Sequence, residues 1–208
     1  MSLRSLAVLV LIPFSAITVA AVIYDGSNGF ANAITHNLTS LQIWVDLVIA
    51  MLFWCGWVLK DAKDSGRNGW PWVIAALIVG AFSPLIYMVV HRRWPASPGP
   101  DSQPGNATTR RSVAAFGLLA LGGLTCAALM ADGTDIATTV TASWSNFQIW
   151  LDLVIVMVLW LGWMFVDARR SGINPWGWLV FGLLLGSFAP LLYTVMHNRW
   201  PASHPPEG

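Results

Sequence analysis

Charged residues are scarce in this sequence. Only 10% of its 208 residues are charged, the formal net charge is +1, and Lys and Arg form no dense run. Nucleic acid binding requires a concentrated basic surface, so nucleic acid is not an expected partner. The composition also falls outside the range of soluble globular domains, in which about a quarter of the residues are charged.

Metal and cofactor motifs are lacking as well. The two cysteines, Cys55 and Cys126, have no CxxC or Cys/His spacing around them. We expect them to be small apolar core residues, and we expect no metal site. The sequence contains no Walker loop, dinucleotide fingerprint, H-E-x-x-H pair or haem motif, so no cofactor is expected and the common soluble-enzyme chemistries have no support.

Hydrophobic residues, in contrast, make up 56% of the chain, which also contains 13 tryptophans. A helix that crosses a bilayer core of about 30 Å needs about 20 mostly apolar residues. The sequence therefore predicts an integral membrane protein whose main partner is the lipid bilayer. Most of the tryptophans fall near the ends of hydrophobic segments, where they would form an aromatic belt at the headgroup level.

The chain contains an internal repeat with an offset of 106 residues. Residues 42–72 align with 148–178, and residues 80–97 align with 186–203. Roughly half of the aligned positions are identical, which is a strong sign of duplication. The chain is therefore predicted to consist of two homologous halves.

Each half contains three hydrophobic segments of spanning length. They lie at about 5–24, 43–59 and 72–90, and at 112–131, 149–166 and 178–196. They predict an all-α integral membrane protein with six transmembrane helices, arranged as two three-helix repeats at 1–97 and 112–208. The Pro-, Gly- and Ser-rich stretch at 98–111 is predicted to be a polar linker. Because three is an odd number, the second repeat is expected to be inverted relative to the first, unless one segment fails to span.

Acidic residues in hydrophobic segments are costly and are functional candidates by default. Asp46 and Asp152 lie about one turn inside the second helix of each half, and Asp61 and Asp167 close these helices fifteen residues later. Each of these helices also presents a tryptophan on the same face, between its two carboxylates. These tryptophans are Trp57 and Trp163.

Two interpretations of these carboxylates stay open. In the functional one, the two faces oppose each other and line a polar path or a substrate cavity. In the structural one, Asp46 and Asp152 cap or pair with a polar group near the helix start. Asp61 and Asp167 would then be solvated at the membrane interface, beside the basic residues that flank them in the sequence. Those residues are Lys60, Lys63, Arg169 and Arg170.

The third segment of each half carries a G-x-x-x-P pattern, from Gly80 to Pro84 and from Gly186 to Pro190. Proline inside a helix removes a backbone hydrogen bond and tends to kink it. Such kinks are tolerated in membranes mainly where helices pack together or line a cavity. The tyrosines that follow are further candidates for a path or cavity. They are Tyr87 and Tyr193.

Taken together, these motifs define a repeated unit. It has an acidic residue early in the second segment, a second Asp, a Gly-x-Asn-x-Trp turn and a third segment with the pattern Gly-x-Phe-x-Pro. In the first half these motifs are carried by Asp46, Asp61, Gly66, Trp70, Gly80 and Pro84, and the second half has their counterparts. The unit resembles a family of small bacterial three-helix integral membrane proteins of unknown function, here duplicated in tandem. The resemblance implies a fold and no activity. We expect the protein to lie in the bacterial inner (plasma) membrane.

Three functions remain as hypotheses. The first is a small transporter or channel with a path at the repeat interface, and the second is a membrane-embedded enzyme that acts on a lipid or isoprenoid by Asp acid/base chemistry. The third is an accessory subunit of a membrane complex. Few polar residues lie in mid-span, and Thr18 and Thr125 are among them, so a hydrophobic or cationic small molecule is the expected ligand. A second copy of the chain, in a homo-oligomer, is a further candidate partner.

Overall fold

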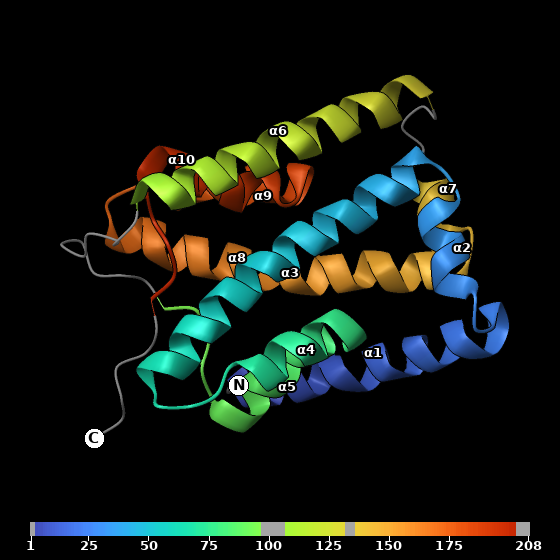
Figure 1. Cartoon of the computed structure of the whole chain (residues 1–208), viewed down its shortest axis with the longest axis horizontal. Helices are drawn as coiled ribbons and strands as arrows, with labels where there is room; N and C mark the ends of the chain where they lie inside the picture. Colours follow the sequence, from blue (N-terminus) through green and yellow to red (C-terminus); the bar gives the residue numbers. More distant parts are fainter. Residues whose placement is uncertain (1–2, 97–106, 132–135, 203–208) are drawn as a thin grey trace.

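The computed structural model describes residues 3–96, 107–131 and 136–202, and Figure 1 shows their arrangement. Their secondary structure is α-helical apart from an isolated antiparallel bridge between Ala96 and Ala202. The first half forms α1 (Leu3–Asp25), α2 (Gly29–Thr35), α3 (Leu38–Asp64), α4 (Trp70–Val79) and α5 (Phe82–His91). The second half forms α6 (Ala107–Ala131), α7 (Ile136–Thr141), α8 (Trp144–Arg170), α9 (Pro175–Leu185) and α10 (Phe188–His197). Most of the predicted linker at 98–111 lies outside the described residues.

Four helices are long and apolar enough to cross a membrane. They are α1, α3, α6 and α8, over Ser5–Asp25, Leu38–Asp64, Arg111–Ala131 and Trp144–Arg170. On α6, the apolar side chains of Phe116 and Leu119 are 74% and 77% exposed, which suits contact with lipid rather than water. These helices agree with the prediction of a helical membrane protein.

The third hydrophobic segment of each half differs from the predicted continuous helix. It is divided into two short helices, α4 and α5 in the first half and α9 and α10 in the second. The two helices fold back on each other, as two contacts between them show. The Ser83 hydroxyl donates to the Trp72 carbonyl at 2.8 Å, and the Trp72 and His91 rings lie 5.4 Å apart. The second half repeats this contact between Trp178 and His197 at 5.4 Å. The expectation of six continuous spanning helices was therefore wrong for these two segments.

Glycine rather than proline makes the break. Gly80 and Gly186 end α4 and α9 with φ of 57° at both, a backbone region that side chains with a Cβ rarely adopt. Pro84 and Pro190 lie in the first turn of α5 and α10, where a missing N–H costs no helical hydrogen bond. We call α4–α5 the first hairpin and α9–α10 the second hairpin.

Both halves run in the same sense through the molecule. Figure 1 shows α3 and α8 starting at the end where α2 and α7 lie and running toward the opposite end, while α1 and α6 run the other way. The predicted inversion assumed three crossings in each half. Because the third segment folds back, each half begins and finishes at the same end of the molecule. The three crossings per half that the predicted inversion assumed are therefore not present in the described residues.

The segments after the two hairpins cross over and tie the halves together. Ala96 and Ala202 exchange backbone hydrogen bonds of 3.1 and 2.8 Å. The carbonyl of Ala202 accepts from the Trp57 indole at 3.1 Å, and the carbonyl of Ala96 accepts from the Trp163 indole at 3.2 Å. Each half therefore contributes its last segment to the packing of the other half's long helix.

Candidate functional site

The carboxylates in mid-helix reach the tips of the two hairpins. Asp152 on α8 accepts from the backbone N–H of Ala81 at 2.8 Å, and Asp46 on α3 accepts from the N–H of Ser187 at 3.0 Å. Ala81 and Ser187 are the N-cap residues of α5 and α10. The first N–H groups of a helix lack helical acceptors and carry a partial positive charge, so a carboxylate is well placed there. The carboxylates therefore cap helices, but the capped helix is in a hairpin of the other half and is not their own helix, whose start is capped by Asn37 or Ser143.

The glycine at each tip allows this close approach. A Cβ added to Gly80 would lie 2.8 Å from Oδ1 of Asp152, and one added to Gly186 would overlap with Oδ2 of Asp46. Both glycines also have the positive φ that breaks the hairpin. A single residue type therefore provides both the turn and the space for the carboxylate.

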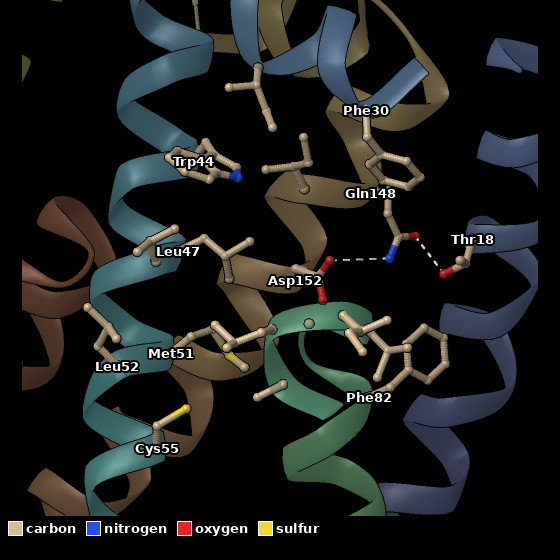
Figure 2. A pocket seen from close by; sticks show the side chains of 18 residues that line it. Thr18, Phe30, Trp44, Leu47, Met51, Leu52, Cys55, Phe82, Gln148 and Asp152 are labelled. Carbon is tan, nitrogen blue, oxygen red and sulfur yellow. Dashed lines mark hydrogen bonds between the residues drawn. The ribbon is translucent and has the colours of Figure 1, made fainter. Parts of the chain in front are cut away.

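Asp152 also lines a cavity of about 460 Å³, shown in Figure 2. We call it the Asp152 pocket. Its polar end is a chain of side chains, in which the Thr18 hydroxyl donates to Gln148 Oε1 at 3.0 Å and Gln148 Nε2 donates to Asp152 Oδ2 at 3.4 Å. Its walls are mostly apolar and include Trp44, Leu47, Met51, Cys55 and Phe82.

Asp46 lines a second cavity, of about 440 Å³, which we call the Asp46 pocket. Most of its lining residues are the counterparts, 106 residues away, of those in the Asp152 pocket. Gln42 corresponds to Gln148 at the offset of 106 residues, and Thr125 on α6, 107 residues after Thr18 on α1, takes the place of that threonine. The apolar walls include Trp150, Leu153, Met157, Leu161 and Phe188. The two pockets thus lie at equivalent places, and each is built from both halves.

Both pockets open sideways. Leu77 and Ile78 line the Asp152 pocket and are 73% and 75% exposed, and Leu183 and Leu184 line the Asp46 pocket and are 74% and 76% exposed. These apolar side chains lie on short hairpin helices beside the long apolar helices. In a bilayer the mouths of the pockets would therefore meet acyl chains rather than water.

The carboxylates at the helix ends have a different environment. Asp61 and Asp167 are fully buried, which contradicts the expectation that they are solvated. Asp167 accepts two hydrogen bonds from Arg199, at 2.7 and 2.9 Å, and Asp61 accepts one from Arg93 at 3.2 Å. The hydrogen bonds to Asp167 raise the pKa of the Arg199 guanidinium above its ordinary value. These arginines lie 32 residues later in the sequence, and the hairpins bring them to the end of the long helix.

The predicted tyrosines and tryptophans belong to the structural frame. Tyr87 donates to Asp61 at 2.6 Å, and Tyr193 donates to Asp167 at 2.7 Å, so both complete the buried ion pairs. Trp57 and Trp163 donate to backbone carbonyls of the opposite half. None of these residues is among those that line the two pockets.

Of the eight predicted site residues, only the two mid-helix carboxylates therefore line the pockets. Sequence reasoning missed the glutamines of the pockets. Gln42 and Gln148 stand four residues before Asp46 and Asp152, on the same face of the helix. This repeated Gln-x-x-x-Asp spacing was the signal that could have identified them.

Chemically, each pocket offers one carboxylate, one amide and a threonine hydroxyl at the end of an apolar cavity, and a second threonine, Thr39, also lines the Asp46 pocket. Within residues 3–96, 107–131 and 136–202, no three His, Cys, Asp or Glu side chains lie close enough together to hold a metal ion. The carboxylate can accept a hydrogen bond or a proton from a ligand, and the apolar walls can hold a hydrocarbon chain. The chain matches no protein family, no curated protein and no solved structure.

Proposed function

We propose that this protein binds hydrophobic molecules of the lipid or isoprenoid class, each with a polar end group, which enter its pockets from the bilayer. One observation carries the proposal: a cavity of about 450 Å³ with apolar walls and a sideways mouth ends at a buried carboxylate, and this arrangement occurs twice. Asp46 and Asp152 form no ion pair with any described residue. Asp152 already accepts through both of its oxygens, from Ala81 and Gln148, whereas Asp46 accepts through Oδ1 from Ser187, so the acceptor capacity left for a ligand is greater at Asp46.

Energetic arguments favour this ligand class. Burying a hydrocarbon chain against apolar walls needs no polar partners, whereas a hydrophilic solute would need several. A hydrogen bond to a charged group contributes about 1.5–3 kcal/mol. One carboxylate at the closed end would thus select molecules that carry a donor at one end.

Transport is the second candidate, and the broken helices favour it. Many transporters bind their substrates where discontinuous helices begin. At the interface of α3 and α8, where a path was predicted, the Trp160 indole donates to the Ala50 carbonyl at 3.1 Å and lies 5.8 Å from the Phe53 ring, and all three residues are buried. A transported molecule would therefore move through the lateral pockets and not between the two long helices.

For the enzyme hypothesis, Asp46 and Asp152 are the candidate acids or bases. The deep tryptophans give less support, because the indoles of Trp160 and Trp163 donate to the carbonyls of Ala50 and Ala96. They are not among the residues that line the pockets. Acid/base chemistry on a bound isoprenoid would therefore depend on the carboxylates.

We also infer that the chain is a parallel repeat of two spans and one re-entrant hairpin per half, with a pseudo-two-fold axis along the membrane normal. Exposed Lys63 and Arg169 are equivalent positions that report on this topology. In a Cys55→Ala, Cys126→Ala background, Lys63→Cys and Arg169→Cys should react with an impermeant maleimide from the same side of a vesicle. Reaction from opposite sides would restore the inverted repeat.

The binding proposal is tested with a photoreactive lipid analogue. We expect a 16-carbon alcohol with a mid-chain diazirine, in phosphatidylcholine vesicles, to label pocket residues such as Met51 and Met157, and unlabelled hexadecanol to compete. The Asp46→Asn, Asp152→Asn double variant should reduce this labelling at least about tenfold, from the lost charge-assisted hydrogen bond. Asp64→Asn, on the exposed end of α3, is the matched control. Even labelling of all lipid-facing helices, with no competition, would refute the proposal.

A further inference from the structure

The two pockets differ in the state of their polar ends. In the Asp152 pocket, Thr18, Gln148 and Asp152 form a continuous hydrogen-bonded chain (Figure 2). Gln148 is only 2% exposed and Asp152 8%, so the amide and the carboxylate of this chain are buried. The polar groups of this pocket are therefore satisfied by one another.

In the Asp46 pocket the same three positions are occupied by the same residue types, but the chain is incomplete. The hydroxyl oxygen of Thr125 is buried and has no hydrogen-bond partner among the described residues. Gln42 is partly exposed, unlike its buried counterpart Gln148. Leaving a buried hydroxyl unpaired costs about 1–3 kcal/mol, and buried polar groups in proteins nearly always have partners.

The groups at this polar end define what a partner must offer. Asp46 can only accept a hydrogen bond when ionised, whereas the Gln42 amide and the Thr125 hydroxyl can each donate one. A hydroxyl group has one donor and two acceptor sites, so it can satisfy all three residues at once. A ketone or ester cannot donate to Asp46, and a carboxylate would be repelled by it.

The hydrocarbon part of the ligand follows from the walls and the mouth. Leu153, Met157 and Leu161 line the cavity, and the exposed Leu183 and Leu184 lie at its opening. An ammonium group could also donate to Asp46, but moving it from water through an apolar mouth costs far more than moving a neutral hydroxyl. A neutral end group is therefore favoured.

We infer that the Asp46 pocket is a binding site for an apolar chain that ends in a hydroxyl, such as a long-chain or polyprenyl alcohol. The ligand hydroxyl donates to Asp46 and accepts from Gln42 and Thr125. The Asp152 pocket, whose polar end is closed on itself, binds this ligand much more weakly. This inference rests on the proposed function and assigns its ligand to one of the two pockets.

The test compares the pockets within one chain. The photoreactive 16-carbon alcohol should label Met157 and Val158 of the Asp46 pocket at least about five times more than Met51 and Leu52 of the Asp152 pocket. The matched methyl ether, which cannot donate, should lose this preference. Site-specific labelling is read from fragment masses, so both pockets are measured in the same sample.

Thr125→Val is the key variant, because it removes the hydroxyl and keeps the shape of the side chain. It should reduce labelling of the Asp46 pocket about threefold to tenfold, consistent with loss of one hydrogen bond of about 1 kcal/mol. Thr125→Ser should restore it, and Thr18→Val, at the equivalent position, should leave labelling of the Asp46 pocket unchanged. The melting temperature of each variant is measured as well. A variant that labels less but keeps the melting temperature of the original protein has lost binding and not folding.

The outcomes separate the two claims. Equal labelling of both pockets, or stronger labelling by the matched 16-carbon amine, would overturn the inference and leave the proposed function standing. The inference would also be overturned if Thr125→Val left the labelling of the Asp46 pocket unchanged. Labelling of neither pocket above the lipid-facing background would refute the proposed function itself.

Discussion

The same two helices carry two pairs of carboxylates with opposite surroundings. Asp61 and Asp167 are fully buried, and each binds an arginine and a tyrosine. Asp46 and Asp152 are also buried, but their main partners are backbone N–H groups at the hairpin tips, and both line a pocket. Burial of an acidic residue therefore does not by itself mark a binding site. The informative feature is whether its acceptor capacity is already used.

The largest expected effect is on the ion pairs at the helix ends. Arg199→Met should lower the free energy of unfolding by about 3–5 kcal/mol, because it leaves the Asp167 carboxylate buried without its arginine. Lys60→Met is the matched control, since the Lys60–Asp64 pair is 39% and 42% exposed and such a pair contributes about 0–1 kcal/mol. Denaturant unfolding in mild detergent measures both. Equal losses would show that Asp167 is not a structural carboxylate.

A smaller effect is expected at the hairpin tips. Gly186→Ala should destabilise the protein by about 1–3 kcal/mol, because the backbone is in a region unfavourable for alanine and the new Cβ would meet Asp46. Gly123→Ala on α6 is the control, since nothing lies within 4 Å of its added Cβ. Alanine there should be neutral or stabilising by up to about 1 kcal/mol. If both variants unfold alike, the close contact between the tip and Asp46 is not a feature of the fold.

Much of the helical architecture could be predicted from the sequence. The long hydrophobic segments and the offset of 106 residues identified α3 and α8 and made Asp46 and Asp152 equivalent. The fold-back of the third segments could not be predicted, because a kinked spanning helix and a re-entrant hairpin have the same length and hydropathy. The difference lies in Gly80 and Gly186, whose positive φ breaks the segment, and in the carboxylates of the other half, which bind the N–H groups of the next residues.

The error at Asp61 and Asp167 follows from the same hairpins. Lys63 and Arg169 are their neighbours in the sequence, so a solvated, interfacial environment was the natural expectation. The arginines that bind them lie 32 residues later, and only the fold-back of each hairpin brings them to the end of the long helix. Contacts of this kind depend on tertiary structure and leave no local pattern.

The smallest effect on stability is expected at a carboxylate that lines a pocket. Asp152→Asn should change the free energy of unfolding by less than about 1 kcal/mol, because the amide oxygen can still accept from the N–H of Ala81. Asp152→Ala removes this cap and should cost about 0.5–2 kcal/mol, as other N-cap losses do. The same unfolding assay compares both variants with Asp167→Asn. A loss for Asp152→Asn as large as that for Asp167→Asn would mean that the charge itself holds the fold together, and the distinction between the two pairs of carboxylates would then fail.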